Sequence, residues 1–227
     1  MNKVSKVLIL SGIILIVSAV LLCVYNINQN KKAFENSQTA LAELKDIIPE
    51  VPESPTETYE EYLKKIEQDS KRNVLEEVEE EYQMTTDTTT QQEPQMTSLQ
   101  LDGRYYCGYI TLDSLDLELP VLNEWSYPNL NIAPCRYEGS PQTHDFIIAA
   151  HNYNSHFGKI KYLQEDDQIV FTDCNGEKFR YNVTYTEYID GYSVEQMSEN
   201  SESWDITLFT CTLNGQSRVT VRAKLAE

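Results

Sequence analysis

The strongest constraint on this chain is a run of 19 residues near its N-terminus that carries no charge. Val7–Tyr25 reads VLILSGIILIVSAVLLCVY and consists mostly of leucine, isoleucine and valine. About 20 apolar residues in a helix cross the ~30 Å hydrocarbon core of a bilayer, whereas the apolar part of a cleaved signal peptide has about 7–15 residues. No Ala-x-Ala cleavage site follows, and bulky Leu22 spoils a lipoprotein-type site at Cys23. Residues 1–25 are therefore predicted to be a tail and an uncleaved signal anchor, with a cleaved signal as the alternative.

The orientation of this anchor follows from the size of its two flanks rather than from their charge. Lys3 and Lys6 precede the run, and Lys31 and Lys32 follow it, so the bias in basic residues that orients membrane helices is nearly even. Most of the chain follows the anchor, and a short N-terminal tail usually stays inside. A single-pass membrane protein with its C-terminal part outside the cell is predicted.

Residues 26–98 read as an acidic extracellular spacer. They hold seven basic and 17 acidic side chains, and prolines 49, 52 and 55 interrupt any helix. Between Tyr59 and Tyr82, apolar residues recur at spacings of three and four, which predicts an amphipathic helix or a weak coiled coil. A polar, threonine-rich stretch then predicts a linker. Pairing of the helix with a partner helix is the alternative to a plain spacer.

Residues 99–227 are predicted to form one packed domain that carries the function. The segment contains both tryptophans and is long enough for a single core. The whole chain has a net charge of −18 and a pI near 4.5. This charge argues against nucleic-acid binding, which needs a basic face to replace phosphate counterions. It equally disfavours a polybasic lipid-binding surface.

The pattern of this domain is mainly β. Short runs of β-branched and aromatic residues alternate with turn residues, and Asn175-Gly176 between two such runs is the strongest hairpin signal in the chain. Seven or eight strands with little helix predict a closed barrel or a sandwich. The expected strands are 105–112, 115–121, 145–150, 169–172, 178–185, 206–211 and 217–225, with short helices at 158–163 and 193–200.

Metal and disulfide sites find little support in the sequence. There is no Cys-x-x-Cys and no His-x-x-x-His, so a structural zinc site is not expected. Cys107, Cys135 and Cys174 have no regular spacing and are predicted to be free structural thiols, although an external compartment permits a disulfide among them. The acidic run 165–167 suggests calcium or, more simply, a solvated turn. No metal and no cofactor is predicted.

Three chemically capable residues stand at the ends of apolar strands. Cys211 ends one strand, His151 directly follows another, and Arg218 opens the strand that returns after Cys211. A cysteine nucleophile needs a base or a cation nearby, and an arginine can bind a developing oxyanion. Taken singly, each has a plainer interpretation: a core thiol, a surface hydrogen bonder and a solvated ion pair. Their shared position at strand ends favours a joint site.

The residues around this site resemble those of a known family. Thr207-Leu-Phe-Thr-Cys211 followed by Arg218 resembles the Thr-Leu-x-Thr-Cys…Arg signature of sortases, the membrane-anchored cysteine transpeptidases of Gram-positive bacteria. The segment 147–152, followed by 157–163 and Asp167, is similar to the family's histidine block. Gly108–Leu112 and Leu119–Val121 are similar to its first two strands. The four blocks stand in the family's order within residues 104–225.

The resemblance implies an eight-stranded sortase β-barrel with short helices and a thiol acyl-transfer reaction. It implies that Cys211 attacks a carbonyl in a Leu-Pro-x-Thr-Gly-type C-terminal sorting motif of a secreted protein and forms a thioester. An amine of a peptidoglycan precursor then resolves the thioester. By the same analogy His151 transfers protons, Arg218 positions the substrate and stabilises the oxyanion, and Thr210 contacts the substrate.

Departures from the family pattern leave the subclass open. His156 and Arg222 are rivals of His151 and Arg218, and Ala150 stands where many members have glycine. The absence of an apolar C-terminal tail and the short segment 188–204 argue against the pilin-polymerising class and class B. A class D-like or other clostridial type is favoured. Another cell-wall cysteine peptidase or transpeptidase fits the order of residues poorly, and a non-catalytic anchored binding module is the remaining alternative.

Overall fold

The computed structural model describes residues 3–51, 96–199 and 202–226. The predicted amphipathic helix of residues 59–82 and most of the threonine-rich linker lie outside these ranges. The predicted domain boundaries at residues 25 and 98 stay predictions.

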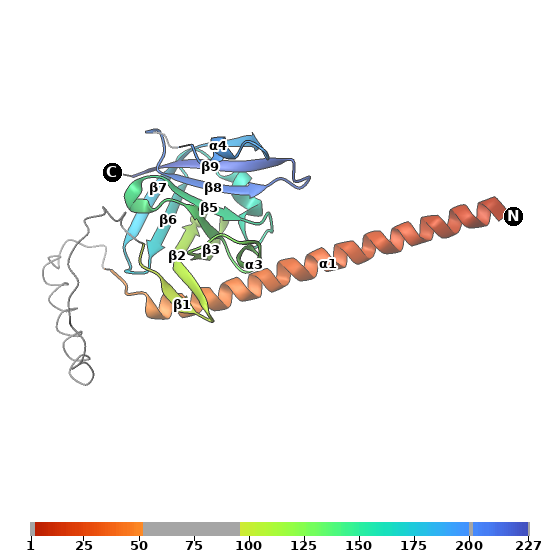
Figure 1. Ribbon diagram of the computed structural model, residues 1–227, viewed down its shortest axis with the longest axis horizontal. Helices are drawn as coiled ribbons and strands as arrows, with labels where there is room; N and C mark the ends of the chain where they lie inside the picture. The colour runs from red at the N-terminus through yellow and green to blue at the C-terminus, as the bar shows by residue number, and fades with distance from the viewer. Residues whose placement is uncertain (1–2, 52–95, 200–201, 227) are drawn as a thin grey trace, which may run out of the picture. The chain divides into compact units, whose positions relative to one another are not determined.

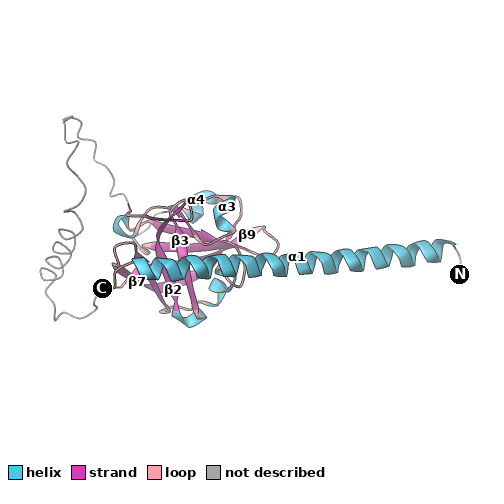
Figure 2. Cartoon of the chain, turned by 90° about the horizontal axis from the view of Figure 1, so that it is seen from below, coloured by secondary structure: helices cyan, strands magenta, loops and turns pink. Residues whose placement is uncertain are grey.

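The N-terminal helix α1 (Lys3–Ile47) contains the whole uncharged run and continues 22 residues beyond it (Figure 2). Its apolar part is long and hydrophobic enough to cross a membrane and is not buried within the protein, so it is a candidate membrane span. The second half behaves differently, because Ala33, Ser37, Leu41 and Leu44 are buried. Their spacing places them on one face of the helix. The sequence analysis, which assigned this segment to a spacer, did not predict that it packs against the folded domain.

Nine strands within the described residues form one sheet in the order β1-β2-β3-β4-β5-β8-β9-β7-β6, and β6 also pairs with β2 (Figure 1). This last pairing closes β2 to β9 into an eight-stranded barrel, and β1 is a short strand added beside β2. The barrel alternative is thereby confirmed over the sandwich. The strands are β1 (Leu99–Leu101), β2 (Arg104–Leu112), β3 (Leu117–Leu122), β4 (Cys135–Glu138), β5 (Phe146–Ala150), β6 (Gln168–Asp173), β7 (Lys178–Asp190), β8 (Ile206–Cys211) and β9 (Ser217–Leu225).

All seven strands expected from the sequence are present. The Asn-Gly hairpin joins β6 to β7, and Gly176 has the positive φ of 83° that this turn requires. The two further strands, β1 and β4, are short and were missed. The short helices are η1 (Asp113–Leu115), α3 (Tyr127–Leu130), η2 (Pro141–Thr143), η3 (Phe157–Tyr162) and α4 (Val194–Met197).

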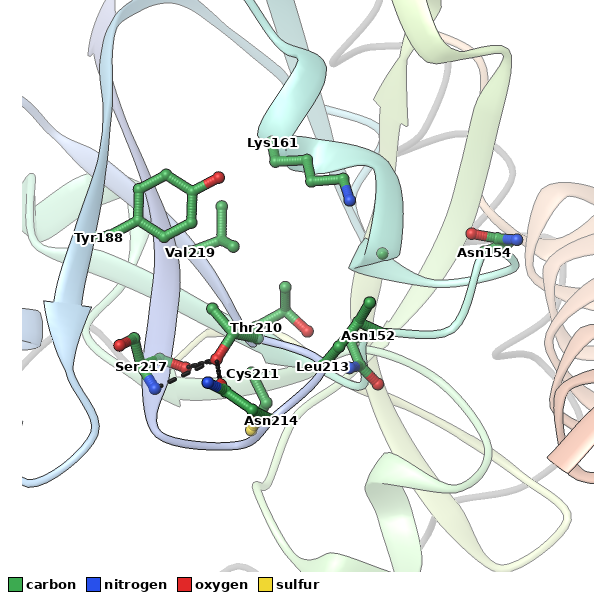
Figure 3. A pocket seen from close by; sticks show the side chains of 12 residues that line it. Asn152, Asn154, Lys161, Tyr188, Thr210, Cys211, Leu213, Asn214, Ser217 and Val219 are labelled. Carbon is green, nitrogen blue, oxygen red and sulfur yellow. Dashed lines mark hydrogen bonds between the residues drawn. The ribbon is translucent and has the colours of Figure 1, made fainter. Parts of the chain in front are cut away.

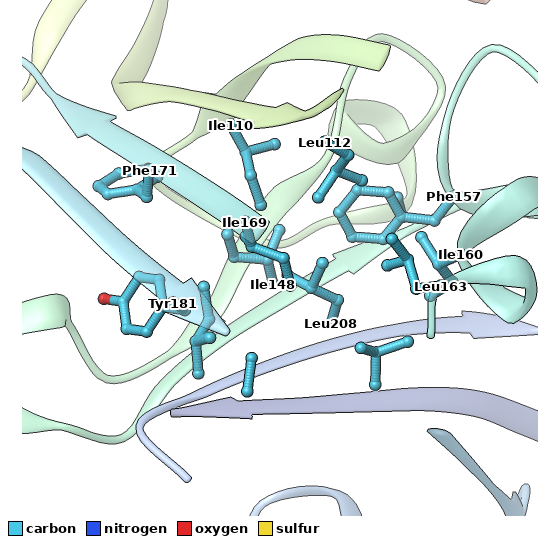
Figure 4. Packing of buried hydrophobic residues seen from close by; sticks show 14 of the residues in the cluster. Ile110, Leu112, Ile148, Phe157, Ile160, Leu163, Ile169, Phe171, Tyr181 and Leu208 are labelled. Carbon is cyan, nitrogen blue, oxygen red and sulfur yellow. The ribbon is translucent and has the colours of Figure 1, made fainter. Parts of the chain in front are cut away.

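The barrel interior is filled by the inward-facing side chains of every long strand. Ile148 from β5, Leu208 from β8 and Ile110 from β2 are fully buried there, together with Phe157 and Ile160 from η3 (Figure 4). Alternate residues along a strand point to opposite faces, so this set also determines which residues of β5 and β8 point outward.

A second apolar layer lies on the outer face of the barrel. Ile147 and Ala149 of β5 and Phe209 of β8 belong to it, and so do Ala40 and Leu44 of α1. This layer explains the unbroken apolar run of β5, in which all five residues are buried. A strand covered on both faces reads as a continuous hydrophobic stretch rather than as an alternation.

Candidate active site

The parallel pairing of β5 and β8 brings His151 and Cys211 to the same edge of the sheet. Ala150 of β5 pairs with Thr210 of β8. His151, which follows Ala150, and Cys211, which follows Thr210, therefore both stand at the carboxyl ends of these strands. The Thr210 hydroxyl donates to the Ala150 carbonyl at 2.8 Å and thus joins the two strands immediately before His151 and Cys211. Two segments 60 residues apart are brought together by this register.

Arg218 stands directly across from Cys211 in the antiparallel pairing of β8 with β9. Side chains of directly opposed residues lie on the same face of a sheet, so the thiol and the guanidinium share a face. Arg218 Nη1 donates to the carbonyls of Gly215 and Ser217 at 3.1 and 3.2 Å. A Cβ on Gly191 would come within 2.9 Å of the same nitrogen. The guanidinium is therefore held from two sides beside the strand end.

The thiol belongs to the outer face of the barrel. Leu208 and Thr210 point inward, so Thr207, Phe209 and Cys211 point outward. Cys211 is partly exposed. A thiol on an outer face at a strand end is open to a polypeptide that approaches from solvent.

His151 is held by a partner on the loop that precedes β4. Its Nε2 lies 3.2 Å from Asn131 Oδ1, and because an amide oxygen only accepts, Nε2 donates. The imidazole lies 4.9 Å from the Tyr153 ring, centroid to centroid. Burial lowers the pKa of His151 below its ordinary value of 6.5. At neutral pH the ring is therefore mainly neutral and able to accept a proton.

A pocket of about 510 Å³ opens on the other side of the β8 end. Thr210 and Cys211 contribute to its wall together with Lys161 and Tyr188, whereas His151 and Arg218 do not line it. Figure 3 shows the Cys211 sulfur directed away from Lys161 and Tyr188. The pocket therefore adjoins the backbone of Cys211, and the reactive atom faces elsewhere.

A row of aromatic side chains leads away from the thiol along the outer face. The Phe209 ring lies 5.4 Å from Tyr137, Tyr137 lies 5.9 Å from Trp125, and Trp125 lies 5.3 Å from Tyr127. Trp125 and Tyr137 also line a pocket of about 320 Å³. This row was not predicted from the sequence because its members come from three separate segments, and only the neighbouring aromatics Trp125 and Tyr127 offered a local signal.

The two alternative candidates for the site, His156 and Arg222, are both buried. His156 is fully buried, and burial lowers its pKa to about 4. Arg222 is 1% exposed, and its guanidinium donates to Glu187, to Thr207 and to the carbonyls of Gln196 and Met197. Neither side chain is free to meet a substrate.

The other cysteines of the barrel are chemically distinct from Cys211. Cys107, Cys135 and Cys174 are buried and unpaired, as predicted. Burial raises the pKa of each thiol, to about 12 for Cys135 and about 11 for Cys174. Since the thiolate is the reactive form, these three cysteines are poor nucleophiles.

The described residues contain no group of three or more His, Cys, Asp or Glu side chains arranged to hold a metal ion. The acidic run suggested as a calcium site forms a turn, in which Asp166 has a positive φ of 69° and Asp167 Oδ2 accepts from the Gln164 N–H at 2.8 Å. The expectation of no metal stays a prediction.

The chain is similar to known proteins of one family. The model of the Sortase domain family matches residues 110–226, more than half of the chain. No curated protein matches. Solved structures that resemble this chain include sortase A from Corynebacterium diphtheriae, with a TM-score of 0.49 and 24% identity over 55% of this chain and 62% of that one. A Clostridium perfringens sortase D5 transpeptidase has a TM-score of 0.48 and 22% identity over 54% and 79%. Clostridium perfringens sortase C, solved with the C-terminal cell wall sorting motif, has a TM-score of 0.47 and 20% identity over 54% of this chain and 71% of that one.

Proposed function

Because this chain belongs to the sortase family, we propose that it is a cysteine transpeptidase that cleaves an LPXTG-type C-terminal sorting motif of secreted proteins. The observation that carries the proposal is the strand register, which sets Cys211 beside the end of the strand that leads to His151 and directly opposite Arg218. A nucleophile, a proton carrier and a fixed cation at one strand edge are the parts that acyl transfer needs.

The reaction follows from the chemistry of these three side chains. The Cys211 thiolate attacks the scissile carbonyl, and Arg218 stabilises the negative charge that develops on the carbonyl oxygen. His151 gives a proton to the leaving amine as the C–N bond breaks, and a thioester remains on Cys211. An amine then attacks the thioester, His151 accepts its proton, and the thiolate of Cys211 leaves. The product carries a new amide bond in place of the old one.

The lowered pKa of His151 suits these proton transfers. A buried imidazole holds its proton weakly, so a proton taken from the thiol passes readily to the departing amine. The Thr210 hydroxyl is bonded to the Ala150 carbonyl, which supports a role in holding the two strands together. The substrate contact predicted for Thr210 stays a proposal.

The setting of the reaction is proposed on the same basis. The acceptor is an amine of a peptidoglycan precursor, and the donors are secreted proteins that carry the sorting motif. The candidate membrane span anchors the enzyme, with the barrel outside the cell. The chemistry uses protein side chains only, without a cofactor. The subclass, class D-like or another clostridial type, stays open.

The test uses the full chain in detergent micelles with a pool of LPXTG-type peptides, with and without an amine acceptor, followed by mass spectrometry. We expect a thioester adduct at Cys211, and an amine-linked product when the acceptor is present. Cys211→Ala should abolish both, whereas Cys174→Ala, which removes a buried thiol with a raised pKa, should retain most activity.

Two other outcomes would contradict the proposal. Activity that persists in Cys211→Ala would rule out the mechanism. A folded protein that forms no adduct with any peptide, and whose Cys211 does not react selectively with a thiol probe, would favour a non-catalytic binding module.

A further inference from the structure

The loop that follows His151 is attached to the N-terminal helix. The Ser155 hydroxyl lies 2.8 Å from Asn30 Oδ1 and 3.3 Å from the Asn30 carbonyl oxygen, and the Ser155 N–H donates to Oδ1 at 3.4 Å. Ser155 is only 8% exposed. These contacts join residues 125 positions apart, and they lie just four residues from the proposed proton carrier.

The loop is compact, so a constraint on Ser155 also constrains the position of His151. The Phe157 N–H donates to the His151 carbonyl at 3.1 Å, and the N–H groups of His156 and Gly158 both donate to the Tyr153 carbonyl at 2.9 Å. A Cβ on Gly158 would come within 2.5 Å of the Asn152 carbonyl oxygen, so glycine permits this close approach. Phe157 anchors the end of the loop in the barrel core. A loop bonded to itself in this way moves as a unit.

A packed row of rings connects the helix to His151. The fully buried His156 lies near the backbone of Ala33 in α1, and its ring centroid is 5.6 Å from that of Tyr153. The Tyr153 ring in turn lies 4.9 Å from His151. Neither ring nitrogen of His156 makes a hydrogen bond of ordinary geometry, and the backbone groups of Ile132 and Ala33 lie near the ring. The ring therefore serves here as packing between the helix and the loop rather than as a second proton carrier.

We propose that Asn30 of α1 is a positioning residue for the proposed transpeptidase: it holds Ser155, and through the compact loop and Tyr153 it fixes the imidazole of His151 for proton transfer. The inference rests on the proposed function. Asn30 lies five residues beyond Tyr25, which is about 7–8 Å along a helix that rises 1.5 Å per residue. The same helix that is proposed to enter the membrane thus holds the loop of the active site close to where it emerges.

The opposite end of the helix contact supplies a matched control. Lys45 Nζ lies 2.5 Å from Glu118 Oε2, and Gln38 Nε2 donates to the Glu118 carbonyl at 3.4 Å. Lys45→Ala therefore loosens the attachment of α1 to β3 without touching the loop. A general effect of helix docking should appear in this variant as well, whereas positioning of His151 should not.

The experiment compares Asn30→Leu, Asn30→Asp and Lys45→Ala in the full chain in detergent micelles. Steady-state kinetics with a sorting peptide and an amine acceptor should show kcat reduced about tenfold or more in Asn30→Leu, with KM unchanged, because displacement of a catalytic group by about 1 Å can cost ~100-fold. Asn30→Asp keeps the acceptor oxygen for Ser155 and should restore most of kcat. Lys45→Ala should retain the kcat of the unmodified chain.

Amide hydrogen exchange of residues 152–157 provides a readout that does not depend on activity. Faster exchange in Asn30→Leu alone, together with the loss of kcat, would support the inference. Faster exchange with an unchanged kcat, or unchanged exchange, would overturn it, and so would an equal loss of kcat in Lys45→Ala. If the unmodified chain transfers no peptide, the proposed function fails, and with it the catalytic role of Asn30, while the exchange data still show whether the helix holds the loop.

Discussion

The packing of α1 on the barrel predicts a large effect from a single substitution far from the active site. Leu44 is fully buried in the outer apolar layer that also contains Tyr106 and Leu122. Replacing a fully buried leucine by alanine costs about 2–5 kcal/mol, from the lost transfer free energy and the cavity left behind. Ile47, on the same helix, is 51% exposed. Ile47→Ala should change the free energy of unfolding by less than about 0.5 kcal/mol.

Urea denaturation of the full chain in micelles measures this difference. Both tryptophans, Trp125 and Trp204, lie in the folded domain, so their fluorescence reports unfolding of the barrel and not of the helix. With a slope of about 1–3 kcal/mol per molar urea, a loss of ~2 kcal/mol lowers the midpoint by about 1 M. Equal midpoints for Leu44→Ala and Ile47→Ala would show that α1 is not part of the cooperative unit, and would refute the reasoning.

Two further predictions concern the buried ionisable groups. The pKa of His156 is lowered by burial to about 4 from 6.5, so between these pH values the unfolded chain binds a proton that the folded chain does not. The free energy of unfolding should therefore fall by up to about 3 kcal/mol as the pH drops through this window, and urea titrations at several pH values should show a much smaller fall in His156→Phe. Arg222→Met should lower the free energy of unfolding by about 1–3 kcal/mol, because the Met197 carbonyl and the Thr207 hydroxyl lose a buried donor, whereas the partly exposed Glu187 regains water; an unchanged urea midpoint would mean that this network contributes nothing to stability.

The strands were largely predictable because their patterns are local. Alternation, β-branched residues and the Asn-Gly turn identify the long strands directly from neighbouring residues. β1 and β4 escaped detection because three or four residues are too few to show a period. The packing of α1 against the barrel was not predicted for a different reason. Its buried face begins with the small residues Ala33, Ser37 and Ala40, and the larger Leu41 and Leu44 that continue it stand close to the prolines that suggested a spacer.

The site was predictable only in part, because it depends on relations between segments. Cys211, His151 and Arg218 were singled out by their place at strand ends and by the family resemblance, and the strand register brings those ends to one edge. His151 was preferred to His156 because residues 147–152 resemble the family's histidine block, and the fold adds a physical reason. Both histidines precede loop residues in the sequence, and only the fold shows that one is half-buried at the strand edge while the other is enclosed against α1.

The register of β8 against β5 and β9 determines which side chains meet at the candidate site. Side chains alternate along a strand, so a shift of β8 by one residue against β5 and β9 would turn Cys211 to the barrel interior and place Thr210 opposite Arg218. The register is favoured by β8, whose apolar Ile206 and Leu208 fill the interior while polar Thr207 faces outward, and by the hydroxyl bond from Thr210 to the Ala150 carbonyl.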